Sequence, residues 1–204
     1  MNADTSPEAE AVLLRLWRVT AAFDALGVPY VIGGSFASMV HGMARATMDA
    51  DIVADLRPGD AAALLGALGD AFYSPGEAAV RQAIERRDSF NLIHLETMFK
   101  IDIFLAGARP FDRPQLARRV GQRVGGRPDE TLWVLSAEDI ILAKLKWFRR
   151  EGEVSERQWR DVLGVIKAQS PGPDADYLRQ WAGLLGGGEF IGAGVGGRGL
   201  RRFA

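Results

Sequence analysis

The sequence predicts an α+β fold, with a small mixed or antiparallel β-sheet flanked by helices and followed by a helical C-terminal region. Up to about residue 108, short apolar and β-branched runs alternate with amphipathic segments, as strands and helices would. After residue 136 the apolar residues recur mainly at helical spacing. We therefore expect a core over 1–108, a basic connector with helices over 109–185, and a flexible glycine-rich tail over 186–204.

The first half of the chain predicts four helices and four strands. In order, they are a helix over 6–26, a strand over 28–32, a helix over 36–42, a strand over 47–55, helices near 59–71 and 75–86, and paired antiparallel strands over 90–96 and 99–106. Ser6 is a good N-cap, and Pro7 suits the first helical position. Ser35 is expected to cap the second helix, and the spacing of Ser74 and Glu77 has the form of a capping box.

The second half predicts one strand and then helices. The strand spans 131–135, and the helices span 137–150, 154–168 and 174–185. Residues 136–139, "SAED", have the form of a capping box at the start of the first of these helices.

Composition excludes several classes of function. The 204 residues contain no cysteine, so disulfides, thiolate zinc sites and thiol nucleophiles are ruled out. A net charge of −1 gives no global attraction to nucleic acid or acidic membranes. The polar, acidic start does not resemble a signal peptide, and no apolar stretch reaches the ~18 residues of a membrane span. We expect a cytoplasmic protein with no membrane partner.

The stretch "YVIGGSFAS", residues 30–38, places a glycine-rich turn between a strand and a helix. Three kinds of site use such a turn. A nucleophile elbow is disfavoured because only 34 residues precede Ser35, too few for the sheet that the motif needs. A dinucleotide fingerprint matches only "GAGVGG" (192–197), which lacks the helix and strand that must follow, and no P-loop motif is present. A phosphate-holding turn remains.

Carboxylates downstream favour this last interpretation. Asp49 and Asp51, two apart in a predicted strand, would project to one side, and Asp102 lies between Ile101 and Ile103 in another strand. The pair could instead be turn or cap residues, although its apolar flanks place it inside the strand. Clustered carboxylates need a neutralising partner, and oxygen-only clusters suit Mg²⁺ together with substrate phosphates.

This three-part pattern resembles the nucleotidyltransferase superfamily that includes DNA polymerase β. "GGS" at 33–35, a gap of thirteen residues, "DAD" at 49–51 and "IDI" at 101–103 carry the resemblance. "HGMARATMDAD" (41–51) is most similar to small bacterial nucleotidyltransferases of toxin–antitoxin and abortive-infection systems. The resemblance implies a nucleotidyltransferase fold and transfer of a nucleoside monophosphate from an NTP, with ATP as a reasonable donor.

The resemblance also implies residue roles. Asp49, Asp51 and Asp102 would be catalytic and would ligate two Mg²⁺ ions, with Mn²⁺ as a substitute, and Asp102 would assist deprotonation of the acceptor. The nucleotide-binding residues would be Gly33, Gly34, Ser35, Arg45 and Lys144.

Several of these residues have alternative explanations. Arg45 could equally be a surface arginine, and Ser35 only a helix cap. Lys144 lies on an apolar helix face, where it either snorkels to solvent or pairs with a phosphate or a carboxylate. His41 and His94 are expected to be structural. The basic segment could be a solvated face or could hold RNA phosphates or an acidic partner; its arginines are at 109, 113, 118, 119, 123 and 127.

Two functional hypotheses follow. The first is an Mg²⁺-dependent enzyme that nucleotidylates a hydroxyl on a partner protein, a tRNA 3′ end or a small molecule. The alternative is a non-catalytic nucleotide-binding or antitoxin-like interaction module of the same fold. The presence of all three carboxylates favours the enzyme.

Overall fold

The computed structural model describes residues 7–42, 49–107, 110–123, 131–150, 152 and 155–185. Arg45, Arg109, Arg127 and the glycine-rich tail lie outside these residues. The described chain divides into two compact units. One comprises residues up to Phe36 together with 46–134, and holds the whole sheet (the sheet unit). The other comprises 37–45 and the residues from Leu135 onwards (the helical unit).

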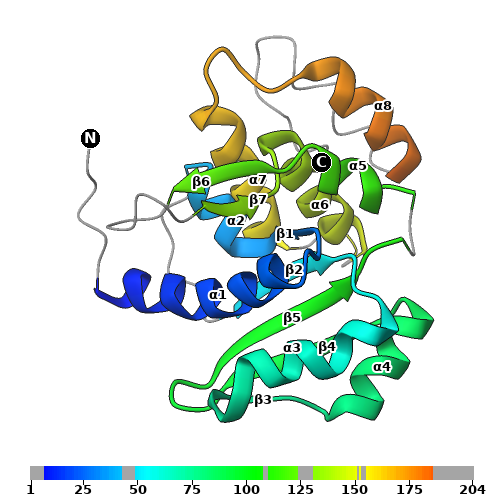
Figure 1. Cartoon of the computed structure of the whole chain (residues 1–204). Coiled ribbons are helices and arrows are strands. Elements are labelled where there is room, and N and C mark those ends of the chain that lie inside the picture. Colours follow the sequence, from blue (N-terminus) through cyan, green and yellow to red (C-terminus); the bar gives the residue numbers. More distant parts are fainter. Residues whose placement is uncertain are drawn as a thin grey trace. The chain divides into compact units, whose positions relative to one another are not determined.

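The sheet contains seven described strands in the order β3-β4-β5-β2-β1-β7-β6 (Figure 1). Their bounds are β1 Tyr30–Ile32, β2 Asp49–Ala54, β3 Phe72–Tyr73, β4 Ser89–His94, β5 Phe99–Leu105, β6 Val120–Arg123 and β7 Thr131–Val134. The β2–β5 and β1–β7 pairs are parallel, and the other pairs are antiparallel. The predicted mixed sheet is confirmed, as is the antiparallel pairing of β4 with β5.

The sheet unit also contains helices α1 (Pro7–Ala25), α3 (Ala61–Leu68), α4 (Glu77–Arg86) and α5 (Asp112–Ala117). Helix α1 packs on α3, and α3 packs on α4. The guanidinium of Arg15 on α1 lies 5.7 Å from the ring centroid of Phe99 on β5, which places α1 over that strand. Burial alternates along β2 and β5, so each strand has one face in the core and one face that is more exposed.

Helix α2 (Gly34–Val40) runs from the sheet unit into the helical unit. The helical unit continues with α6 (Ala137–Arg150), α7 (Glu156–Ala168) and α8 (Ala175–Leu185). The rings of Phe148 and Trp159 pack 5.5 Å apart between α6 and α7. As predicted, Ser136 caps α6, because its hydroxyl accepts the backbone N–H of Asp139.

The starts of two helices differ from the prediction. Helix α2 begins at Gly34, whose φ is +60°, so Ser35 lies in its first turn and does not precede it. Helix α4 begins at Glu77 with Gly76 as its N-cap, and the Ser74 hydroxyl accepts the Gly76 N–H instead. The structure also shows α5, β3 and β6, which the sequence did not predict.

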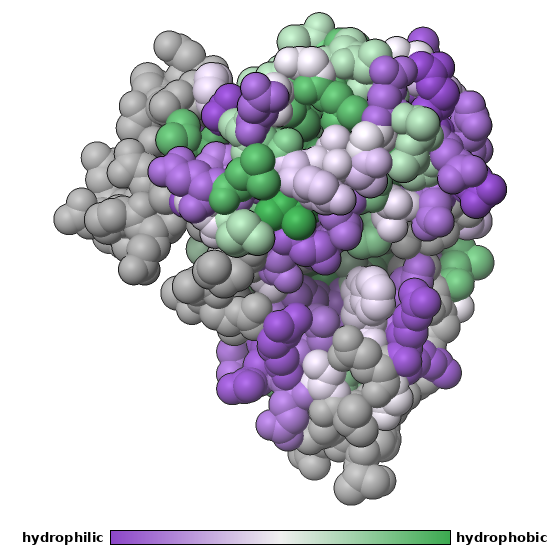
Figure 2. All heavy atoms as spheres, turned by 90° about the horizontal axis from the view of Figure 1, so that it is seen from below, coloured by the Kyte–Doolittle hydropathy of each residue, from purple (hydrophilic) through white to green (hydrophobic). Residues whose placement is uncertain are grey.

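The predicted helix over 59–71 is shorter than expected. Only Ala61–Leu68 is α-helical, between 3₁₀ turns at Pro58–Asp60 and Gly69–Ala71. On the face drawn in Figure 2, hydrophobic residues form small groups among hydrophilic ones, as is ordinary for a surface that faces water. Within the described part of the chain, no helix is both long and apolar enough to cross a membrane.

Candidate functional site

The parallel pairing of β2 with β5 brings two of the predicted carboxylates side by side. Asp51 pairs with Asp102, and Asp49 pairs with Lys100. Because paired residues on neighbouring strands project to the same side, and residues two apart on one strand do likewise, all four side chains share one face. The intervening residues Ala50 and Ile101 are buried. The sequence pattern thus separates a core face from a polar face on both strands.

Lys100 brings positive charge to this polar face. Its Nζ lies 2.9 Å from Oδ2 of Asp102. Hydrogen bonding to Asp102, and then the negative charges of Asp102, Asp49 and Asp51, raise the pKa of Lys100, against the opposing effect of burial. Lys100 therefore lies among three carboxylates, and their oxygens and its ammonium group make this face of the two strands strongly polar.

The Gly33–Gly34 turn packs its bare backbone against this face. The Gly33 N–H donates a 2.8 Å hydrogen bond to the Asp51 carbonyl oxygen, which fixes the turn at the edge of β2. A Cβ placed on Gly34 would lie only 2.0 Å from Oδ2 of Asp51. With its φ of +60°, Gly34 therefore meets two requirements that glycine satisfies best: a left-handed backbone and close approach to a carboxylate.

Two further predicted nucleotide-binding residues, Ser35 and Lys144, lie in the described part of the chain. Ser35 is half-buried in the first turn of α2. Lys144 is in the helical unit, where its Nζ lies 2.8 Å from Oδ2 of Asp161. These two side chains are only 6% and 5% exposed, so Lys144 does not snorkel to solvent. The partner Asp161 was missed; its place in an apolar helical segment, "QWRDVL", is a signal that could have identified it.

Both histidines have protein partners. His41 Nε2 lies 2.6 Å from the Leu135 carbonyl oxygen within the helical unit. His94 Nδ1 lies 2.9 Å from the Thr97 hydroxyl, and burial lowers the pKa of His94, with the positive charge of Arg15 acting in the same direction. These contacts agree with the structural roles that the sequence analysis favours.

The polar face of β2 and β5 can be compared with the needs of a divalent cation. Its donors are carboxylate oxygens, and an ammonium group already lies against one of them, so the donor chemistry fits a hard cation such as Mg²⁺. However, in the described parts of the chain no three acidic, histidine or cysteine side chains come close enough to form a metal-binding group. Asp51 and Asp102 are at one register position, and Asp49 is two residues away.

Solved structures with this fold are known. An antigenic nucleotidyltransferase-like protein from Paracoccidioides brasiliensis is 21% identical, with a TM-score of 0.56 and coverage of 80% of this chain and 77% of that one. ANT(2″)-Ia in complex with adenylyl-2″-tobramycin is 14% identical, with a TM-score of 0.56 and coverage of 86% and 97%. The lincomycin-bound lincosamide antibiotic adenylyltransferase LnuA is 16% identical, with a TM-score of 0.51 and coverage of 76% and 97%. These similarities confirm the predicted nucleotidyltransferase fold.

Sequence comparison identifies the family. No curated protein matches the chain. Residues 15–181, however, match the family described as "Nucleotidyl transferase AbiEii toxin, Type IV TA system". This match includes all three carboxylates and the glycine turn, and it confirms the resemblance to nucleotidyltransferases of toxin–antitoxin systems. The chain therefore belongs to the AbiEii nucleotidyl transferase toxin family, and it is a nucleotidyltransferase.

Proposed function

We propose that this protein is an Mg²⁺-dependent enzyme that transfers a nucleoside monophosphate from an NTP to a hydroxyl acceptor at the polar face of β2 and β5. The observation that carries the proposal is the register of Asp51 with Asp102, next to Asp49 and under the bare backbone of Gly34. Three carboxylates share this face with Lys100, and carboxylate oxygens are the ligands that Mg²⁺ takes together with substrate phosphates.

In this proposal the three aspartates hold the metal and the acceptor. Asp49, Asp51 and Asp102 would hold Mg²⁺, as two ions or with Mn²⁺ as a substitute, which would supply charge stabilisation for the triphosphate. The acceptor oxygen forms a bond to the α-phosphorus, and the bond from the α-phosphorus to the bridging oxygen of the β-phosphate breaks. Pyrophosphate leaves, and Asp102 accepts the proton of the hydroxyl.

The glycine turn would hold the triphosphate. Backbone N–H groups at Gly33, Gly34 and Ser35 would donate to phosphate oxygens, since the absence of a Cβ at Gly34 allows close approach. Arg45 and Lys144 stay predictions as nucleotide ligands. For Lys144 the ion pair with Asp161 supports a second role, which is to hold α6 against α7.

ATP is the expected donor, and the acceptor belongs to one of three classes: a partner-protein side chain, a tRNA 3′ end or a small molecule. The names of two structural relatives, an adenylyltransferase bound to lincomycin and ANT(2″)-Ia bound to an adenylylated tobramycin, describe small-molecule acceptors. The family description, by contrast, names a toxin, which favours a cellular macromolecule as acceptor.

The alternative is a non-catalytic nucleotide-binding module. Such a module would bind NTP through the glycine turn and arginines alone, so its binding would not need Mg²⁺. Retention of all three carboxylates, together with the family match, supports the enzyme.

The test is transfer of label. The protein is incubated with Mg²⁺, each α-labelled NTP in turn and a bacterial lysate, and the products are treated with RNase or with protease. We expect label on an acceptor with the wild type and none with the Asp49→Asn/Asp51→Asn variant. Loss of label on RNase or protease treatment identifies RNA or protein as the acceptor. Equal labelling by the double variant would contradict the proposal.

A further inference from the structure

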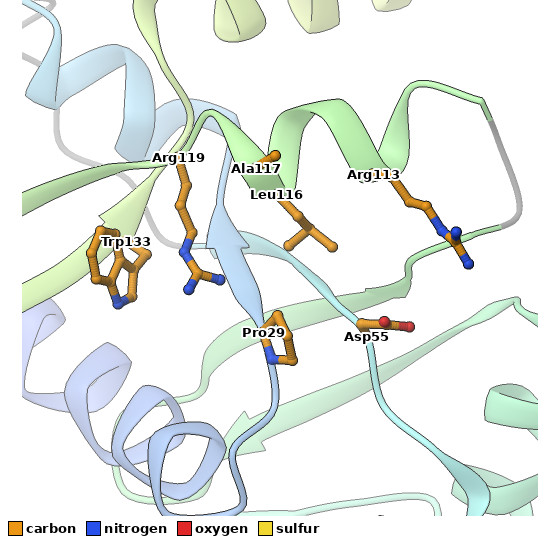
Figure 3. Close-up of a pocket in the computed structure, with 7 residues that line it drawn as sticks. All are labelled: Pro29, Asp55, Arg113, Leu116, Ala117, Arg119 and Trp133. Carbon is orange, nitrogen blue, oxygen red and sulfur yellow. The ribbon is translucent and has the colours of Figure 1, made fainter.

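A cavity lies in the sheet unit, at the end of the strands opposite the carboxylates. It has a volume of about 560 Å³, and its lining includes Pro29, just before β1, and Asp55, just after β2 (Figure 3). At about 3.3 Å per strand residue, Asp55 is roughly 20 Å along β2 from Asp49. This cavity is therefore separate from the site proposed for the NTP and the metal.

Two arginines from the basic segment line this cavity. Arg113 is in α5, and Arg119 follows it just before β6. Figure 3 shows the Arg119 side chain extending towards Pro29 and the Arg113 side chain at the other end of α5, away from Arg119 and nearer to Asp55. Among the six arginines of the segment, only these two line the cavity as far as the structure describes them. The structure thus distinguishes arginines that the sequence pattern treated alike.

Arg119 is held in place by the protein. Its Nη1 donates a 3.3 Å hydrogen bond to the Tyr30 carbonyl oxygen, and its guanidinium lies 4.7 Å from the ring centroid of Trp133. The charge of Arg119 also lowers the pKa of Asp24, although burial is the larger effect and raises that pKa overall. A guanidinium fixed by a carbonyl and an indole loses little conformational freedom when it binds an anion.

Arg113 contributes charge that no described carboxylate balances. It is exposed and makes no ion pair with any residue that the structure describes. Asp55, the acidic residue of the cavity lining, is already paired with Arg87, whose Nη1 lies 3.1 Å from Oδ1. Among the residues that line the cavity there are two guanidinium groups and one carboxylate, and that carboxylate already has Arg87 as a partner. This imbalance favours an anionic ligand.

The rest of the lining is apolar. Leu116, Pro29 and the Trp133 indole provide non-polar surface next to the guanidinium groups. A cavity of this volume is within the range of small-molecule sites, ~300–1,000 Å³, and is much larger than a lone phosphate requires. The lining thus suits a molecule with one anionic end and an apolar or aromatic body.

We propose that this cavity binds a phosphate ester of mononucleotide size, with its phosphate on Arg113 and its organic part extending past Leu116 and Pro29 towards Arg119. Guanidinium groups match phosphate geometry through paired charge-assisted hydrogen bonds. Two sources share this chemistry, a free nucleotide and a nucleotide within an RNA strand. The proposal concerns a site other than the carboxylates and stands even if the transfer activity proposed above is absent.

The experiment measures binding with the first site disabled. Titration calorimetry uses the Asp49→Asn/Asp51→Asn variant of the full chain in EDTA, with AMP, adenosine or a ten-nucleotide RNA as probe. We expect AMP or the RNA to bind and adenosine to bind at least tenfold more weakly, since it lacks the phosphate. Binding of AMP identifies a free nucleotide as the ligand, and binding of the RNA alone identifies a strand.

Arginine variants in the same background locate the site. Arg113→Ala should weaken binding of the phosphate probe at least tenfold, and Arg113→Lys should restore part of it because the charge returns. Arg123→Ala is the matched control, since Arg123 is an exposed arginine of the same segment outside the cavity lining, and it should leave the affinity unchanged. The proposal is overturned if neither AMP nor RNA binds, or if Arg113→Ala and Arg123→Ala weaken binding equally.

Discussion

Two clusters of charge in this chain differ in how far they are open to solvent. In the helical unit, Lys144 and Asp161 form a buried pair, with side chains that are 6% and 5% exposed. In the sheet unit, Asp49, Asp51 and Asp102 form a carboxylate cluster with Lys100, whose side chain is 46% exposed, while that of Asp102 is 18% exposed. A ligand cannot reach a pair that is closed to solvent, whereas it can reach a cluster that is open to solvent. The difference indicates which cluster is the site and which supports the fold.

The largest expected effect is a fall in the rate of nucleotide transfer when one charge is removed from the carboxylate cluster. Asp51→Asn should lower the rate by about 10³-fold or more, because several kcal/mol of transition-state stabilisation are lost at ~1.36 kcal/mol per tenfold. Steady-state rates with α-labelled ATP measure the effect. Asp70→Asn, an exposed aspartate in the same unit, is the control and should keep the wild-type rate.

Substitutions in the buried pair of Lys144 and Asp161 should change the stability of the protein. Lys144→Met leaves Asp161 buried without its cation, and the free energy of unfolding in urea should fall by about 3–5 kcal/mol. The double variant Lys144→Met/Asp161→Leu should recover most of this loss, because replacing both charges with apolar groups is often neutral. A double variant that is stable and active assigns the pair to the fold; one that is stable but inactive would instead support Lys144 as a nucleotide ligand.

Two glycines with similar φ values test the close approach to Asp51. Gly34 and Gly27 have φ values of +60° and +64°, but only Gly34 has a carboxylate where its Cβ would be. Alanine should cost about 1–2 kcal/mol of stability at either position through left-handed strain. Gly34→Ala should in addition lower the transfer rate by about 10²-fold, because displacement of a reacting group by ~1 Å costs that much. Equal rates in the two variants would show that the glycine turn is only structural.

Removal of the Lys100 ammonium group should have a smaller effect, and it should strengthen metal binding where removal of a carboxylate weakens it. Its ammonium group competes with any added cation for Asp102. Lys100→Met should lower the Mg²⁺ concentration for half-maximal transfer by about twofold to fivefold, as expected from the ~0.5–1 kcal/mol of a partly exposed ion pair. The exposed Lys167→Met is the control. A higher Mg²⁺ requirement in Lys100→Met would mean that the ammonium supports the site.

The smallest effect concerns His94, a buried group of the sheet unit outside the carboxylate cluster. Because its pKa is lowered in the folded state, the unfolded chain takes up a proton first as pH falls below about 6.5. Stability should therefore decrease as pH falls from there towards the lower folded pKa, and His94→Gln should flatten this part of the stability curve. Denaturant titrations at several pH values would expose the opposite slope if the sign were wrong.

Local pattern was enough to predict the polar face. Alternation along "DADIVA" and "FKIDIFL" separates Asp51 and Asp102 from the buried residues between them, because a strand has a period of two. The strand pairing that places Asp51 beside Asp102 joins segments some fifty residues apart, and no local signal encodes it. The sequence alone could therefore identify the aspartates, whereas the pairing of Asp51 with Asp102 is known only from the structure.

Other features depend on contacts that the sequence does not display. Strand β6, "VGQR", lacks an apolar run and forms by pairing with β7, where Gly121 is opposite Trp133. A Cβ on Gly121 would lie 2.8 Å from the Thr131 side chain, so the glycine accommodates its neighbour and does not mark a turn. The pairing of Lys144 with Asp161 joins two different helices, so the apolar helical segment around Asp161 marks that residue but not its partner.

The most direct test of the proposed function is a measurement of metal binding at the carboxylate cluster. Mn²⁺ titration followed by electron paramagnetic resonance, in the presence of a non-hydrolysable ATP analogue, compares the wild type with Asp51→Asn and Asp70→Asn. The account predicts that Asp51→Asn binds Mn²⁺ at least tenfold more weakly, while Asp70→Asn binds it as the wild type does. Mn²⁺ binding by Asp51→Asn at wild-type affinity would show that the carboxylates of β2 and β5 do not form the metal site.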